Sequence, residues 1–156
     1  MNVALSEAMK AELNNEIPVG AVIVHKGKVV SQHHNLVKKN IDPTAHAEIL
    51  CIREVAQNLG SHHLDEHEIY ITLEPCAMCI QAISFSRIKR VYFGAYDEKF
   101  GAIENGIRFF NTSSANHVPE VYGGIQQEKA IEILQGFFKK IRDSKKSVKD
   151  DLINKN

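Results

Sequence analysis

The chain has 156 residues, of which 44% are hydrophobic and 24% charged, and its 19 basic and 19 acidic side chains give a formal net charge of zero. This length and composition are typical of one globular domain with a buried core, and they exclude an intrinsically disordered chain. The zero net charge argues against wholesale, non-specific coating of nucleic acid.

Residues 1–16 mix acidic, basic and apolar side chains, so they lack the basic start and apolar block of a secretion signal. No apolar run approaches the roughly 20 residues that would span a bilayer. We therefore expect a cytoplasmic protein without membrane contacts, whose three cysteines are reduced rather than joined in disulfides. Reduced thiols leave three uses: metal ligation, catalysis and burial.

The charge is unevenly distributed along the chain. Residues 137–156 contain seven basic and three acidic side chains, so this end carries +4 and the rest of the chain −4. We expect residues 143–156 to form a basic, solvated and frayed tail after a single domain that spans residues 1–142. Lys139, Lys140 and Arg142 differ from the tail because they belong to a helix with an apolar stripe.

The first half of the chain predicts a helix, a β-hairpin and a second helix. Residues 4–13 are good helix formers, and the β-rich residues 17–24 and 28–33 are joined by Lys26-Gly27, which indicates a hairpin. Asp42-Pro43-Thr44 is a helix start, and a glycine ends that helix. The apolar positions that predict its buried stripe are Ala45, Ile49, Ile52, Ala56 and Leu59.

The second half of the chain alternates strands with helices. Residues 68–73 predict a buried strand, and Pro75 suits the first position of the helix that follows. Residues 90–94 and 118–122 predict two further strands, separated by a mixed segment that holds a short helix and a loop. The last helix is predicted over residues 126–142, with an apolar stripe at Ala130, Leu134, Phe137 and Ile141. This alternation predicts a single α/β layer sandwich.

Two cysteines three positions apart form the strongest chemical signal in the chain. Cys76 and Cys79 lie in the first turn of one predicted helix, on the same face, where both thiols can bind one ion. The helix dipole and the unpaired N–H groups of the first turn favour the thiolate form, which is the form that binds zinc. Two thiolates do not complete a tetrahedral site, so a third ligand is needed.

His46 is the candidate for this third ligand, and Glu48 follows it by two positions. Residues two apart on a regular helix point in nearly opposite directions, so His46 must lie on the entering turn and Glu48 just inside the helix. One His and two Cys leave the fourth zinc position to water, as in an open catalytic site. Zinc lowers the pKa of that water, and a carboxylate that is not itself a ligand can move its proton.

Other residues with metal-binding or aromatic side chains have simpler interpretations. Cys51 falls inside the helix after His46, and we expect it in the core. Phe137 and Phe138 cannot both be buried on one helix stripe, so we expect Phe137 to point inward and Phe138 toward the substrate. Rather than a second metal site, we expect surface-loop histidines at positions 33, 34, 62, 63 and 67.

The order H-A-E, twenty-six residues, then P-C-A-M-C is similar to the signature of the zinc-dependent nucleobase deaminases. The chain more closely resembles the bacterial tRNA-specific adenosine deaminases (the TadA family). The matching segments are PVGAVIV (18–24), Asn35, DPTAHAEI (42–49), TLEPCAMC (72–79), SRIKRVYFGA (86–95), DEKFGA (97–102) and FFKKIR (137–142). The chain departs from the family pattern at Val37, where proline is common, and at the bulkier Tyr96 and Phe100.

The resemblance implies a fold and a chemistry. The fold is a three-layer α/β/α sandwich around a central mixed sheet of about five strands. One zinc ion per subunit is bound by His46, Cys76 and Cys79, and Glu48 moves a proton from zinc-activated water to adenine. The reaction is hydrolytic deamination of the wobble adenosine, position 34 of a tRNA anticodon loop, to inosine. A homodimer is also implied.

The resemblance further implies six substrate contacts. Asn35 and the backbone amide of Ala47 contact the flipped nucleoside. Asp97 and Lys99 contact neighbouring anticodon nucleotides. On the last helix, Phe138 provides stacking and Arg142 a phosphate contact.

Two other functions remain open from the sequence. A free-base or nucleoside deaminase acting on guanine, cytosine or cytidine would use the same zinc chemistry. Against it, a small free base has no need of a basic, aromatic C-terminal helix. A zinc-stabilised binding protein without catalysis would have no need of Glu48 as a proton carrier.

Overall fold

The computed structural model describes the backbone of residues 1–153; residues 154–156 and the side chains of residues 145 and 147–153 lie outside the described part. The elements in chain order are α1 (Asn2–Leu13), β1 (Gly20–His25), β2 (Lys28–His34), α2 (Val37–Asn40), α3 (Ala47–Leu59), β3 (His67–Leu73), α4 (Ala77–Phe85), β4 (Arg90–Ala95), the 3-10 helix η1 (Phe109–Asn111), β5 (Glu120–Tyr122) and α5 (Gln127–Ile153).

The five strands form one mixed sheet in the order β2-β1-β3-β4-β5. β1 pairs antiparallel with both β2 and β3, whereas β3, β4 and β5 run parallel. The predicted hairpin is confirmed: Lys26 and Gly27 connect β1 to β2 with φ values of 50° and 75°. Positive φ at both turn positions is the conformation that matches the twist of a two-residue hairpin.

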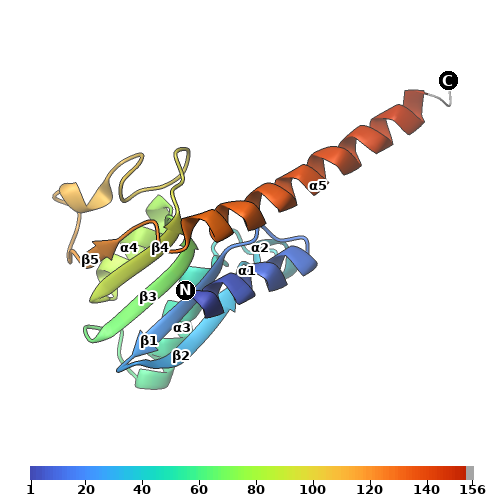
Figure 1. Ribbon diagram of the computed structural model, residues 1–156. Coiled ribbons are helices and arrows are strands. Elements are labelled where there is room, and N and C mark those ends of the chain that lie inside the picture. The colour runs from blue at the N-terminus through green and yellow to red at the C-terminus, as the bar shows by residue number, and fades with distance from the viewer. Residues whose placement is uncertain (154–156) are drawn as a thin grey trace.

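Helices cover both faces of the sheet, so the predicted three-layer sandwich is confirmed (Figure 1). The main core lies between the sheet and the layer of α3 and α4, where Ile71 and Phe93 pack in one cluster with Cys51 and Ile83. α1 and α5 cover the other face. Gly20 allows α1 to approach β1 closely, because a Cβ atom there would lie 2.1 Å from the carbonyl oxygen of Ala4.

Two predictions about the helices α3 and α4 are wrong in detail. The buried face of α3 includes Glu48, Cys51 and Val55, whereas Leu59 of the predicted stripe is exposed. The first residue of α4 is Ala77 and its N-cap is Cys76, so Pro75 precedes the helix rather than opening it.

Two further helical features differ from the prediction. The short helix α2 was not predicted. α5 continues to Ile153 rather than ending at residue 142, and its distal half extends beyond the rest of the domain (Figure 1). We expected a frayed tail at residues 143–156. Most of the side chains in this range lie outside the described part, so this expectation stays a prediction. Within the described residues, no helix has both the length and the apolar character required to cross a bilayer.

One edge of the sheet collects four chain segments. The start of β1 lies beside the end of β2, since Gly20 pairs with His34, and the ends of the parallel strands β3 and β4 align through Leu73 and Ala95. The residues before β1 and after β2, β3 and β4 therefore meet at this edge. In α/β sheets, ligands typically bind beyond the carboxyl ends of the strands.

Candidate active site

Two helix N-termini position the three predicted metal ligands at this edge. His46 is the N-cap of α3 and Cys76 the N-cap of α4, and both have extended backbone conformations, with ψ of 150° and 172°. Cys79 is the third residue of α4 and is fully buried. Both helices direct their positive dipole ends toward the same point, which favours thiolate there.

The three side chains are arranged as a tetrahedral metal site requires. His46 Nδ1 lies 3.8 Å from Cys76 Sγ and 3.5 Å from Cys79 Sγ. Zinc bonds of about 2.0–2.1 Å to nitrogen and about 2.3 Å to sulfur place such ligands about 3.6 Å apart. The donors therefore fit zinc, and no other group of three or more His, Cys, Asp or Glu side chains in the described residues is arranged to hold a metal ion.

The charges within this group are coupled. The neighbouring Cys79 thiol, with His46, holds the pKa of Cys76 well below its usual value, at about 4. Contact with Cys76 raises the pKa of His46, and the adjacent Cys76, together with burial, raises the pKa of Cys79. The lowered pKa favours the thiolate form of Cys76, and a bound cation would displace the proton from Cys79.

Glu48 lies beside the three ligands in the first turn of α3. Its side chain is 3% exposed, and its Oε2 atom has no hydrogen-bond partner among the described residues. Burial raises the pKa of this carboxyl group. A buried carboxyl with a free oxygen next to a metal site can accept and return a proton.

These residues border a cavity of about 340 Å³. His46, Glu48 and Cys76 form one part of its wall, and the apolar side chains of Val19 and Leu73 form another. Mostly apolar walls with a few polar groups are typical of a small-ligand site.

Comparisons with known proteins identify the family. Residues 1–95 match the cytidine and deoxycytidylate deaminase zinc-binding region. The tRNA-specific adenosine deaminase of Agrobacterium fabrum is 46% identical over 142 residues, which cover 91% of this chain and 93% of the relative. The chain belongs to the tRNA-specific adenosine deaminase family. The Bacillus subtilis member is 38% identical over 152 residues, covering 97% of this chain and 94% of the relative.

A solved structure from a study of A-to-I editing by tRNA:A34 deaminases agrees with the fold of this chain. It superposes with a TM-score of 0.85 at 46% identity and covers 86% of this chain and 97% of the solved one. The predicted zinc cofactor and the predicted fold are both consistent with this family.

The structure brings Asn35 and Ala47 together, and Asn35 engages the Ala47 N–H that the family resemblance assigned to the nucleoside. Asn35 is 6% exposed, lines the cavity, and accepts a hydrogen bond through Oδ1 from the Ala47 N–H at 3.0 Å. This bond satisfies one of the free N–H groups at the start of α3. Without the family resemblance, the sequence would have left Asn35 as a turn residue.

Asp97 and Lys99 occupy the loop after β4, but of these two only Asp97 lines the cavity. The Asp97 carboxylate accepts hydrogen bonds from the backbone N–H groups of Lys99 and Phe100, each at 3.0 Å. The Lys99 ammonium lies 4.9 Å from the centre of the Phe100 ring. Phe100, which the sequence marked only as a departure from the family pattern, forms part of the cavity wall.

Phe138 and Arg142 are on α5 and are not among the residues that line this cavity. The predicted orientation of the aromatic pair is confirmed for Phe137, which is 4% exposed, while Phe138 is 42% exposed. Arg142 and Lys139 line a separate hollow along α5, together with Glu128 and Glu132.

Two buried acids near the cavity were missed by the sequence analysis. Glu16 accepts hydrogen bonds from the N–H groups of Lys38 and Lys39 and so holds the short helix α2. Glu74 lies within the TLEPC segment, where the pattern of metal ligands assigns it no role. A carboxylate placed directly between a buried strand and Pro75 is the signal that was available.

The expected surface-loop position of five histidines is wrong for three of them. His33 and His34 lie in β2 and are half-buried. His67 lies in β3, is 5% exposed, and stacks on His25 with ring centroids 4.4 Å apart. His62 and His63 are exposed, as expected. Cys51 is fully buried in the core, which confirms its predicted place.

Proposed function

We propose that this chain deaminates the wobble adenosine of a tRNA anticodon loop to inosine. The observation that carries the proposal is the group of His46, Cys76 and Cys79 with the free Glu48 carboxyl oxygen beside it, in a chain of this family. The net reaction adds water at C6 of adenine and releases ammonia.

The chain's own groups account for metal binding and proton transfer. His46 Nδ1 and the two cysteine Sγ atoms would hold zinc. When bound, zinc supplies the lowered pKa that makes water a nucleophile near neutral pH. Glu48 Oε2 takes a proton from the water and delivers it to the base, because it is buried next to the ligands and unengaged.

Asn35 would orient the nucleoside, and Ala47 would hold Asn35 in place through its backbone N–H. Asn35 Oδ1 is already engaged by the Ala47 N–H, which leaves its Nδ2 group for the substrate. A cavity of about 340 Å³ suits a single base turned out of a loop. A base in an unpaired loop is less costly to extract than one in a duplex.

The remaining predicted contacts would bind the RNA around the target base. Asp97 and Phe100 lie at the cavity, with Lys99 beside them on the same loop. The exposed Phe138 offers a stacking surface. Lys139 and Arg142 supply positive charge on α5, as phosphate binding requires.

We also infer a cytoplasmic homodimer, which the family resemblance implies. Three unbridged cysteines, two of them metal ligands, suit a reducing compartment. Light scattering from the purified protein should give twice the mass of one chain. A monomeric mass at working concentrations would reject the dimer.

The function is tested by incubating the zinc-loaded protein with an anticodon stem-loop that carries adenosine at position 34. Free adenosine, guanine, cytosine and cytidine are assayed in parallel. Inosine in the stem-loop, with the free compounds unchanged, is the expected result. Turnover of a free base or nucleoside alone would replace the tRNA assignment by a small-molecule deaminase with the same metal site.

A further inference from the structure

Glu74 is a buried carboxylate that binds one segment of the chain through five hydrogen bonds. It follows β3, immediately before Pro75, and is 2% exposed. Its Oε1 atom accepts from the backbone N–H groups of Ile103, Glu104 and Asn105 at 3.0, 2.8 and 3.0 Å. Its Oε2 atom accepts from the Asp97 N–H at 3.0 Å and from Asn105 Nδ2 at 2.6 Å. All five donors lie between residues 97 and 105.

These hydrogen bonds explain how a charge is tolerated at this position. A buried carboxylate is costly unless it is paired or fully hydrogen-bonded. Within the described residues Glu74 forms no salt bridge, so the five N–H donors replace a cation. Hydrogen bonds to an ionised acceptor are stronger than neutral ones. Both oxygens are engaged, so Glu74 is not placed to carry protons as Glu48 is.

The segment held by Glu74 is also joined to the metal ligand Cys76. Gly101 forms an isolated antiparallel bridge with Cys76, and the Ala102 N–H donates to the carbonyl oxygen of Pro75 at 3.0 Å. A Cβ atom on Gly101 would lie 2.5 Å from the Glu74 carboxyl group. Glycine at position 101 therefore allows the carboxylate to sit inside the loop.

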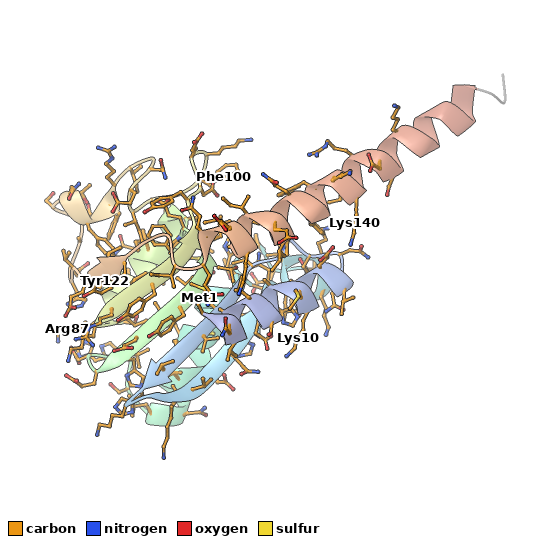
Figure 2. All side chains as sticks on the ribbon, in the orientation of Figure 1. Met1, Lys10, Arg87, Phe100, Tyr122 and Lys140 are labelled. Carbon is orange, nitrogen blue, oxygen red and sulfur yellow. The ribbon has the colours of Figure 1, made fainter. Side chains whose placement is uncertain are left out.

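The same segment supplies one wall of the cavity through Asp97 and Phe100. Phe100 is 63% exposed and lies on the loop that follows β4 (Figure 2). Its position is thus fixed less by its own packing than by the backbone of the loop. That backbone is bound by Glu74 at both ends, at Asp97 and at residues 103–105.

We propose that Glu74 is a positioning residue that fixes the 97–105 segment, and with it the substrate-facing wall, relative to the metal ligands. It acts through Asp97 and Phe100 rather than on the reacting atoms. Its effect on turnover rests on the proposed function. Its effect on the order of the loop does not.

The test uses the zinc-loaded Glu74→Gln variant. A glutamine keeps one carbonyl acceptor, but its amide nitrogen cannot accept the remaining N–H bonds. Zinc content should be unchanged, and hydrogen exchange in residues 97–105 should become faster. On the stem-loop, kcat/KM should fall roughly 10- to 100-fold, carried mainly by KM, because the wall binds substrate but does no chemistry. Glu104→Gln, which makes the same change at an exposed side chain of the loop, should match the wild type.

A second variant, Asn105→Ala, removes one of the five donors and leaves the carboxylate in place. It should raise KM less than Glu74→Gln does. If Glu74→Gln fails to fold, hydrogen exchange and KM of Asn105→Ala test the proposal instead. Unchanged exchange and an unchanged KM in the variants would overturn the proposal. So would loss of zinc from Glu74→Gln while Asn105→Ala stays normal, since Glu74 would then support Cys76 alone. A wild type inactive on the stem-loop would reject the proposed function, and the exchange data would still decide the role of Glu74.

Discussion

Asn35 Oδ1 accepts a hydrogen bond from the backbone N–H of Ala47 at 3.0 Å, across twelve positions of the chain. The bond joins the end of β2 to the first turn of α3, next to His46, one of the three candidate metal ligands. Asn35 thereby has two separable parts: an oxygen that supports α3 and an amide nitrogen that is available to the substrate.

Asn35→Asp separates these two parts. The aspartate keeps an acceptor for the Ala47 N–H and carries a charge that the N-terminus of α3 stabilises. We expect the fold and zinc content to be retained and kcat/KM on the stem-loop to fall about 10- to 100-fold, the effect of removing one substrate hydrogen bond. Asn40→Asp, the same change at an exposed position of α2, is the control. Wild-type kinetics in Asn35→Asp would show that Nδ2 does not bind substrate.

Glu48→Gln tests the proton carrier. The side chain keeps its shape, and the three ligands are untouched, so zinc should bind in the usual amount. Without a group that moves the proton, kcat should fall by roughly 10²–10⁴. Glu54→Gln is a matched control on the same helix, since the Glu54 carboxylate binds Ser31 and His33 instead of facing the cavity. Near-normal turnover in Glu48→Gln would remove Glu48 from the mechanism.

The double variant Lys139→Ala/Arg142→Ala tests the basic side of α5. Removing the two positive charges that are proposed to bind phosphates should weaken stem-loop binding. The slope of log K against log salt should become shallower by about 0.7 for each phosphate that is no longer neutralised. Affinity is best measured by fluorescence anisotropy over a range of salt concentrations. Lys26→Asn/Lys28→Gln removes two charges from the hairpin turn and should leave the slope unchanged. If both double variants behave alike, α5 makes no specific contact with the RNA.

Lys140 does not share the hollow that Lys139 and Arg142 line. Its ammonium is bound to Glu12 of α1 at 2.6 Å, so it joins α5 to α1 (Figure 2). Lys140 therefore lies on a different side of the helix from Lys139 and Arg142, which line one hollow together.

The cysteine pair of the candidate metal site was predictable from the sequence because its determinants are local, whereas its contact with His46, thirty positions from Cys76, depends on the fold. Cys76 and Cys79 are brought together by one turn of α4, and the starts of α3 and α4 are each preceded by a proline. The buried face of α3 was assigned incorrectly because the prediction used the positions of apolar side chains alone. Apolar periodicity cannot show that Glu48, a charged residue, is buried.

The cavity wall was not predictable in the same way. The 97–105 segment has no periodic pattern, and its conformation depends on Glu74, more than twenty positions earlier in the chain. Family resemblance located Asp97 and Lys99 in this loop but not the residue that holds it. His67 was predicted to lie in a loop because the predicted strand began at residue 68, whereas β3 begins one position earlier, at His67 itself.

His67 gives the last prediction. It is buried in β3 against His25, its Nδ1 atom has no partner among the described residues, and burial lowers its pKa. The unfolded chain therefore binds a proton more readily than the folded one. The stability that this group contributes is present above its unfolded pKa of about 6.5 and is lost as the pH falls through its lower folded value.

His67→Phe keeps a flat ring against His25 and removes the titrating group. Between pH 7.5 and 5.5, the free energy of unfolding should therefore fall less in the variant than in the wild type, as measured by denaturant titration. Loss of zinc at low pH affects both proteins equally and cancels in the comparison. His62→Gln, at an exposed histidine, should retain the wild-type pH dependence. Identical pH dependence in His67→Phe and the wild type would mean that His67 is protonated equally in the folded and unfolded chains.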